Sequence, residues 1–383
     1  MVSEKRKPWC VEPFTVLESK VFGPWGLCCR SGPLPYSARD VMPLDHFNSD
    51  LMKRVRLQML NHQHSPEIEK YCFKCIEHEK NGVQSRRQGV NSTYEDMFPV
   101  VQQDGTINVE DMKFRQIEIK LFGNLCNLEC RMCGPDYSST IAARMKKEGT
   151  LDGPVLHDVI KNYNTNQLQS FYSDMEQILP HAIDIKFTGG EPMMLQSVHQ
   201  FIEWMVDKGF NQHLRLKIIS NGTKVNEKFL HNANKFRQFS IALSIDGTWD
   251  VDEYQRRGTN FEDVVNNIAI FKKYSDRVHI VGVLTALNVS DLNNLASFAL
   301  HHNLKLNMSS VLVTPEELQV KVLPPQYRKK ILKELQFNFN EEVYQALKDP
   351  EFPVDLWHKM LDKYDKVFEI IPELKQYDDR VRK

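Results

Sequence analysis

Residues 116–135 read QIEIKLFGNLCNLECRMCGP, and they combine a short β-like run with three closely spaced cysteines. The run Gln116–Leu121 alternates polar and apolar side chains, which is typical of a β-strand. Cys126, Cys130 and Cys133 follow it in a Cys-x3-Cys-x2-Cys spacing. The stretch therefore predicts a strand that leads directly into a loop on which three soft thiol ligands converge.

Three kinds of site use cysteines at such a spacing. Offsets of four and seven residues also place side chains on one face of a helix, so buried core cysteines are one interpretation. Zinc and cubane iron–sulfur clusters are the others, and both normally use four protein ligands. Because the loop offers three thiols and no obvious fourth, we favour a cluster in which one iron lacks a protein ligand and binds a substrate or cofactor.

From Gln116 onward, short β-like runs alternate with amphipathic helical runs, which predicts βα units around a parallel sheet. The expected strands are Gln116–Leu121, Ile183–Phe187, Leu214–Ile219, Phe239–Ile245, Val278–Leu284 and Leu304–Met308. The expected helices lie near Ser138–Glu148, Ser197–Lys208, Val225–Lys235, Phe261–Tyr274 and Ser290–His301. Six βα steps fall short of the eight that close a complete barrel, and in barrels the chemistry lies at the carboxyl ends of the strands. We expect an α/β fold with a partial barrel.

The cysteine loop after the first strand resembles the signature of radical S-adenosylmethionine (SAM) enzymes, whose core is a partial (β/α)6 TIM-like barrel. The resemblance implies that Cys126, Cys130 and Cys133 hold a catalytic [4Fe–4S] cluster, and that the amino and carboxylate groups of SAM chelate its fourth iron. One electron, from a donor such as flavodoxin or ferredoxin, would then cleave SAM to methionine and a 5′-deoxyadenosyl radical. That radical would abstract a hydrogen atom from the substrate.

Later loops are similar to further motifs of this family. Residues 187–192 (FTGGEP) resemble its Gly-Gly-Glu motif, and residues 220–223 (SNGT) and 244–247 (SIDG) resemble its ribose-contacting strand ends. Arg256 or Arg257 could pair with the methionine carboxylate in a bidentate fashion. Asn-Gly, Asp-Gly and glycine pairs are also common in turns, which is the alternative for these positions. The SAM contacts implied by the resemblance are Gly189, Gly190, Glu191, Ser220, Asn221, Ser244, Asp246 and Arg257.

The first 105 residues contain one clear helical stretch, Asp50–Asn61, and the other five cysteines, which are Cys10, Cys28, Cys29, Cys72 and Cys75. With no export signal, a disulfide framework is not expected, and clustered thiols indicate metal binding or redox chemistry. A Cys-x2-Cys pair with distant thiols suits zinc and iron–sulfur equally, and His62 and His64 could join a zinc site.

The amino-acid sequence of this segment favours an iron–sulfur cluster over zinc. Residues 26–29 and 72–85 resemble the twitch domain, a reduced relative of the SPASM domain that carries one auxiliary cluster in radical SAM enzymes. That domain usually follows the barrel, and its N-terminal position here resembles a branch that includes phage-encoded members. The resemblance implies a second [4Fe–4S] cluster on Cys10, Cys28, Cys72 and Cys75, with Cys29 as the spare thiol.

Composition sets limits on the function. The 383 residues include 49 Lys+Arg and 50 Asp+Glu, with 41% hydrophobic and 26% charged residues, which is typical of a globular protein and gives no sign of nucleic-acid binding. The longest apolar stretch, Val278–Leu287, is about half of the roughly 20 residues that a membrane-spanning helix needs. The charged first residues run into Pro8 instead of an apolar signal core. We expect a cytoplasmic protein with no membrane segment.

These observations predict three domains: an auxiliary iron–sulfur domain at 1–105, the core barrel at 106–323 and a helical extension at 324–383. The leading interpretation is a radical SAM enzyme that acts on a peptide or protein, because related SPASM and twitch enzymes often do so. A small-molecule substrate, such as a sugar or nucleotide precursor, is the alternative. The non-enzymatic alternative is a zinc-organised binding protein, which would be colourless and have no affinity for SAM.

Overall fold

The computed structural model describes residues 9–21, 24–36, 40–80, 84–152, 155 and 163–378. Residues 81–83, which belong to the segment that resembles the twitch domain, lie outside the described residues. The chain divides into two compact units. The first comprises Met1–Leu125, Gly153–Ile218 and Lys228–Phe239, and the second comprises Cys126–Asp152, Ile219–Glu227 and Ser240–Lys383. The domain boundaries expected after residues 105 and 323 stay a prediction.

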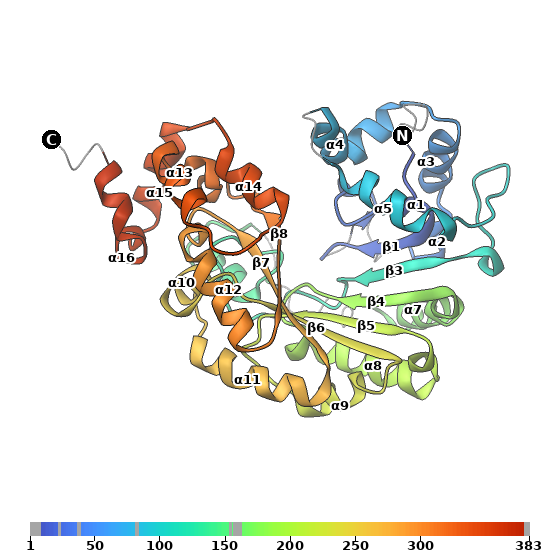
Figure 1. The fold of residues 1–383 in the computed structure, drawn as a ribbon. Coiled ribbons are helices and arrows are strands. Elements are labelled where there is room, and N and C mark those ends of the chain that lie inside the picture. Colours follow the sequence, from blue (N-terminus) through green and yellow to red (C-terminus); the bar gives the residue numbers. More distant parts are fainter. Residues whose placement is uncertain are drawn as a thin grey trace. The chain divides into compact units, whose positions relative to one another are not determined.

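The first unit contains a sheet in the order β2-β1-β3-β4-β5 (Figure 1). Its strands are β1 (Val16–Ser19), β2 (Trp25–Gly26), β3 (Phe114–Ile119), β4 (Ala182–Phe187) and β5 (Arg215–Ser220), of which the last two residues belong to the second unit. The β1–β2 pair is antiparallel, and β1–β3, β3–β4 and β4–β5 are parallel. One row of paired residues is fully buried and apolar, and it forms part of the core: Leu17, Ile117, Ile185 and Leu216.

Helices of the first unit surround this sheet and build the region before it. They are α1 (Glu12–Thr15), α2 (Pro43–Phe47), α3 (Asp50–Leu60), α4 (Pro66–Lys80), α5 (Arg86–Tyr94), α7 (Thr165–Ile178), α8 (Gln196–Asp207) and most of α9 (Glu227–Ala233). The predicted helix Asp50–Asn61 is confirmed as α3, where the Ser49 hydroxyl accepts a hydrogen bond from the Met52 N–H as an N-cap. Its Val55 and Met59 are fully buried, so an apolar stripe packs α3 into the core.

The second unit continues the alternation of strands and helices. Its strands are β6 (Gln238–Ser244), whose first two residues belong to the first unit, β7 (Arg277–Leu284) and β8 (Lys305–Val311), which pair in parallel in that order. Its helices up to β8 are α6 (Ser139–Lys147), α10 (Trp249–Gln255), α11 (Phe261–Tyr274) and α12 (Leu292–His301). All six predicted strands are therefore present, and the α/β class with a parallel sheet is confirmed.

Residues beyond β8 form a group of short helices in the second unit (Figure 1). They are α13 (Pro325–Glu334), α14 (Glu341–Lys348), α15 (Val354–Lys363) and α16 (Val367–Ile370). The buried guanidinium of Arg328 links them, because it donates to the carbonyl oxygens of Leu323, Asp349 and Glu351. Across the described residues, no helix combines the length and the apolar character that crossing a membrane requires.

Candidate functional site

The three-cysteine loop lies between the end of β3 and the start of α6, and the first residues of α6 hold it. The Cys126 N–H donates to the Ser139 hydroxyl at 3.2 Å, and the Thr140 hydroxyl donates to the Cys126 carbonyl at 2.6 Å. Ser138, the N-cap of α6, donates its hydroxyl to the Leu128 carbonyl at 2.6 Å. The sequence SST at 138–140 therefore both starts a helix and fixes the first half of the loop.

The segment after α10 holds the other half of the loop through its backbone. The N–H groups of Glu129 and Arg131 donate to the carbonyls of Arg257 (2.8 Å) and Gln255 (2.9 Å). The Arg131 guanidinium also lies 3.9 Å from the centre of the Tyr254 ring and donates to the Tyr254 carbonyl at 2.8 Å. The loop that carries Cys130 is thus paired with a second segment by main-chain bonds.

Two polar side chains of the second unit contact the thiols. Asn221 places its Nδ2 3.8 Å from Cys126 Sγ, and Arg256 places its Nη1 3.8 Å from Cys130 Sγ. Arg256 is also paired with the buried Asp246, with 2.7 Å between Nε and Oδ2. Although burial opposes its charge, Asp246 and Cys130 raise the pKa of Arg256. A permanent positive charge therefore lies beside the cysteine loop.

The thiols themselves are largely removed from water. Burial raises the pKa of the Cys130 thiol to about 12 and raises that of Cys133, while Arg256 acts in the opposite direction on both. Charge on Cys126 and Cys133 raises the pKa of Cys130 further, so the three sulfurs are close enough to influence one another. Thiolates are the form that binds iron, so metal binding here would release protons. The donor set fits a shared iron–sulfur group.

The remaining predicted SAM residues of the second unit lie around this loop in different ways. Ser220 is buried and accepts a hydrogen bond from the Gly222 N–H, and Ser244 is half-buried at the end of β6. Asn221 accepts from the Thr223 N–H, so it forms the turn that was the alternative reading and also contacts the thiol.

The two candidate arginines lie in contrasting surroundings. The side chain of Arg257 is 64% exposed and lies 3.5 Å from a Glu129 carboxylate oxygen, whereas that of Arg256 is 11% exposed. The structure therefore brings Arg256, and not Arg257, to the thiols. Arg257 as a SAM ligand stays a prediction.

The Gly-Gly-Glu motif lies in the first unit, after β4, and packs against the residues that precede the cysteine loop. The Glu191 N–H donates to the Leu125 carbonyl at 2.7 Å. A Cβ on Gly190 would lie 2.3 Å from that same carbonyl oxygen, so only glycine fits. Gly189 has φ +135°, and the buried Glu191 carboxylate accepts from the Met193 N–H at 3.1 Å. Leu125, which this motif contacts, directly precedes Cys126 in the sequence.

Four cysteines of the first unit line one small cavity: Cys10, Cys28, Cys72 and Cys75. Cys10 precedes α1, Cys28 follows β2, and α4 carries the other two. Cys29, His62 and His64 are not among the lining residues, and the two histidines are exposed. Burial raises the pKa of the Cys10 and Cys28 thiols, and that of Cys72 to about 11. The four predicted thiols thus share one cavity.

Charged residues around this cavity gave no signal in the sequence. Glu12 is buried and bridges Arg86 and Arg115, each with a guanidinium nitrogen 2.7 Å from its carboxylate. Lys20, just after β1, donates to the carbonyls of Cys28 (3.3 Å) and Cys29 (3.2 Å) and pairs with Glu18 at 2.8 Å. Such partners are far apart in sequence, so only the folded chain reveals them.

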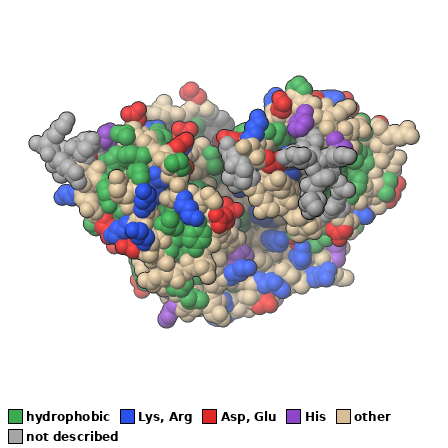
Figure 2. All heavy atoms as spheres, turned by 45° about the horizontal axis from the view of Figure 1, so that its top comes forward, with side chains coloured by type: hydrophobic (Ala, Val, Ile, Leu, Met, Phe, Trp, Pro, Cys, Tyr) green, Lys and Arg blue, Asp and Glu red, His purple; other side chains and the backbone are tan. Residues whose placement is uncertain are grey.

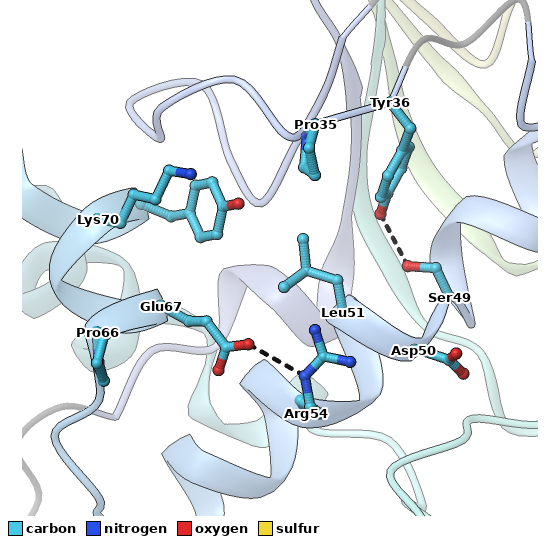
Figure 3. Close-up of a pocket in the computed structure, with 10 residues that line it drawn as sticks. Pro35, Tyr36, Ser49, Asp50, Leu51, Arg54, Pro66, Glu67 and Lys70 are labelled. Carbon is cyan, nitrogen blue, oxygen red and sulfur yellow. Dashed lines mark hydrogen bonds and ion pairs between the residues drawn. The ribbon is translucent and has the colours of Figure 1, made fainter.

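Among the described residues, no group of three or more His, Cys, Asp or Glu side chains is arranged to hold a single metal ion. A cubane bonds each cysteine to a different iron, so the thiols that it needs are not gathered around one point. A further groove lies between α3 and α4, bordered by the Arg54–Glu67 ion pair at 3.0 Å and the Tyr36–Ser49 hydrogen bond at 2.8 Å (Figure 3). None of the predicted site residues lines that groove.

One family model matches part of the sequence. Residues 121–299 match the family described as the Radical SAM superfamily. The solved structure of anSMEcpe with bound AdoMet and Cp18Cys peptide is similar with a TM-score of 0.43 and 19% identity. That match covers 57% of this chain and 58% of the other, so this chain spans less than two thirds of its length.

A second solved structure is also similar. Streptococcus suis SuiB bound to precursor peptide SuiA matches with a TM-score of 0.38 and 10% identity, over 91% of this chain and 77% of the other. No curated protein matches the sequence.

Proposed function

We propose that this chain, a radical SAM iron–sulfur enzyme by virtue of the radical SAM domain at residues 121–299, modifies a peptide or protein by abstracting a hydrogen atom from it. The observation that carries the chemistry is the loop of Cys126, Cys130 and Cys133, which follows β3 and has the Arg256 guanidinium 3.8 Å from Cys130 Sγ. When bound there, a [4Fe–4S] cluster supplies the electron that cleaves SAM and so generates the 5′-deoxyadenosyl radical.

Each nearby side chain then has a distinct task. The Arg256 guanidinium balances the negative charge of the Cys130 thiolate at 3.8 Å, and Asp246 keeps that guanidinium in place. Asn221 donates toward Cys126 Sγ. Gly190 allows the Gly-Gly-Glu backbone to approach Leu125. The resemblance implies that residues 189–191 contact the amino-acid end of SAM. Ser220 and Ser244 supply hydroxyls that can hydrogen-bond ribose hydroxyls. The Asp246 carboxylate is engaged by Arg256 and by the Val283 N–H, so its direct contact with SAM stays a prediction.

The cavity of Cys10, Cys28, Cys72 and Cys75 holds a second, auxiliary [4Fe–4S] cluster in this proposal. Its support is that the four thiols line one enclosed space while Cys29 does not. Together with the resemblance of residues 26–29 and 72–85, the shared cavity supports the proposal that the first 105 residues are a twitch domain placed before the barrel. The auxiliary cluster would relay electrons or support the substrate pocket, and flavodoxin or ferredoxin would be the external electron donor.

A peptide or protein is the proposed substrate because enzymes with twitch and SPASM domains often modify peptides. A sugar or nucleotide substrate is the second candidate, and a cytoplasmic location is part of the same proposal. A zinc-organised protein without catalysis is the third candidate, and its colourless product makes it simple to distinguish.

The test is anaerobic purification followed by iron and sulfide analysis and by assay of 5′-deoxyadenosine from SAM and a chemical reductant. We expect roughly eight irons per chain for two cubanes. Cys130→Ala should retain about four and form no 5′-deoxyadenosine, because three thiolates hold the catalytic cubane. Cys29→Ala, which removes the spare thiol, is the matched control and should behave as wild type. Formation of 5′-deoxyadenosine by Cys130→Ala would overturn the assignment of this loop.

A further inference from the structure

One face of the parallel sheet in the first unit is charged where such sheets are normally apolar. Parallel sheets are usually buried on both faces and built from near-continuous hydrophobic runs. Here the register places one charged residue from each of four strands in a single row: Glu18, Glu118, Lys186 and Lys217. The next row of the same face contains Gln116, Asp184 and Arg215. Side chains two residues apart share a face, so these rows form one polar surface.

Ion pairs connect these rows. Lys120, directly after β3, lies 3.2 Å from Glu18 and 3.0 Å from Glu118, and Lys186 lies 3.2 Å from Glu118. Asp184 is in turn paired with both Arg215 and Lys217, each at 2.5 Å. Although burial opposes its charge, Lys120 and Lys186 lower the pKa of Glu118 to about 2, so it is ionised at neutral pH.

The two signs of charge are not equally accessible. The three carboxylate side chains, Glu18, Glu118 and Asp184, are only 1–4% exposed. The cationic side chains are 11–37% exposed: Lys20, Lys120, Lys186, Arg215 and Lys217. Five cations over three carboxylates leave two positive charges in excess, and the cations form the outer layer. Figure 2 shows the basic and acidic side chains on one face of the molecule, with several basic ones at the lower right of the view.

The strand register also places two of these five cations opposite each other as a like-charge pair. Lys186 and Lys217 lie directly opposite each other on β4 and β5. Like charges in directly opposite positions repel and destabilise a sheet. Glu118 and Asp184 offset part of this repulsion from below, and an anionic ligand above the pair would offset it further.

We propose that this face binds the carboxylate groups of an acidic peptide segment of the substrate. The inference rests on the proposed function and narrows its substrate class. The charged row crosses four strands, or about 14 Å at roughly 4.8 Å between neighbours, which suits several spaced charges better than one compact anion. Four of the five cations on this face are lysines, which act as single point charges. Phosphate sites instead favour bidentate arginines and helix N-termini.

The row also lies where a substrate segment would be useful. Glu118 and Lys120 stand at the carboxyl end of β3, and the chain reaches Cys126 six residues after Lys120. In barrel enzymes the reaction takes place at this end of the strands. A peptide held by its acidic side chains on this face would therefore be held at the end of the sheet from which the cysteine loop departs.

Fluorescence anisotropy with the reconstituted full chain tests the proposal. The probe is a labelled octapeptide of alternating Glu and Gly, and the matched peptide has Gln in place of Glu. We expect the Glu peptide to bind at least about tenfold more tightly, and its affinity to fall as salt rises from about 50 to about 300 mM, because salt screens partly exposed charges. Equal affinity for the two peptides would overturn the proposal.

Variants locate the binding face. The double variant Lys186→Met with Lys217→Met should bind the Glu peptide about tenfold more weakly, because two cationic contacts are lost. Lys208→Met with Lys228→Met removes two exposed lysines from α8–α9 positions of the same unit and should bind like wild type. If the first double variant melts early, Lys186→Arg with Lys217→Arg keeps both charges and should retain binding. Loss of binding in the Arg pair, or wild-type binding by the Met pair, contradicts the proposal.

Two further measurements separate the alternatives. Tripolyphosphate that displaces the peptide at concentrations where glutamate has no effect would assign the face to phosphate and overturn the peptide substrate. The assay of 5′-deoxyadenosine on wild-type protein is independent of this binding. If the protein makes 5′-deoxyadenosine but does not prefer the Glu peptide, only the present inference is wrong. If it binds the Glu peptide but does not cleave SAM, only the proposed function is wrong.

Discussion

The two groups of cysteines are built in opposite ways. Cys126, Cys130 and Cys133 lie within eight consecutive residues, and main-chain bonds to residues 255 and 257 hold their loop. The four thiols of the first unit come from three segments between residues 10 and 75, and they meet only because α1, β2 and α4 pack together. The first group is therefore local and the second is assembled by folding.

The charges beside the two groups differ as well. Arg256 lies near the local thiols and favours their ionised form, whereas the buried Glu12 raises the pKa of Cys10 after burial itself has done so. A metal stabilises the fold most when its ligands come from distant segments. Such a site does not exist in the unfolded chain, so the free energy of metal binding adds to the free energy of folding. The comparison predicts that the N-terminal cluster is more structural and the loop cluster more chemical.

The largest expected effect tests this difference in stability. Cys75→Ala should lose about half of the iron and lower the free energy of unfolding by about 3 kcal/mol or more, because the metal links three distant segments. Cys130→Ala should lose a similar amount of iron with a much smaller change. Thermal unfolding of both anaerobic proteins, followed by circular dichroism, measures the difference. Equal destabilisation would show that both groups are equally structural.

Two adjacent arginines allow the role of the buried positive charge beside the cysteine loop to be tested. Arg256→Met should destabilise the protein by about 3 kcal/mol, because it leaves the buried Asp246 carboxylate without its partner. Arg257→Met removes a largely exposed guanidinium and should change stability by less than about 0.5 kcal/mol. Denaturant titration compares the two variants, and Arg256→Lys should restore part of the loss. Similar values for both Met variants would contradict the assigned positions.

The close approach of the Gly190 backbone to the Leu125 carbonyl can be tested by glycine-to-alanine substitutions. Gly190→Ala should cost about 2 kcal/mol and weaken SAM binding, because its Cβ would overlap the Leu125 carbonyl. Gly89→Ala is the control, since nothing lies within 4 Å of its Cβ position and alanine favours the helix that contains it. Urea unfolding and SAM titration by calorimetry give both quantities. A neutral Gly190→Ala would mean that the motif and Leu125 are not in contact.

The smallest effect concerns the assembled site. Lys20→Met should cost about 1 kcal/mol and loosen the Cys28 loop, because one ammonium holds two of its carbonyls. Iron release from the N-terminal site to a chelator should then be faster. Lys53→Met, which breaks an exposed ion pair with Asp104, is the control and should leave iron release unchanged. Unchanged release in Lys20→Met would remove Lys20 from the support of the site.

The same contrast explains what the sequence could reveal. The six strands and the three-cysteine loop are continuous patterns, so each could be predicted from its own residues. The strand β1 was missed because Val16–Ser19 is only four residues long and pairs with β3 about one hundred residues later. The helix α7, with its capping box of Asn164 and Gln167, was also missed. The sequence could not show which of Arg256 and Arg257 lies beside the thiols. The two are neighbouring arginines just after α10, and only the folded backbone sets the direction of each side chain.

The backbone pairing of residues 129 and 131 with 257 and 255 also bears on how this loop can evolve. Main-chain atoms make both hydrogen bonds, so these bonds do not depend on the side chains at positions between the cysteines. Substitutions at Met132 can therefore accumulate while the spacing of the sulfurs is preserved. A saturation library of this segment should tolerate diversity between the cysteines and reject insertions or deletions, which would shift one partner along the other.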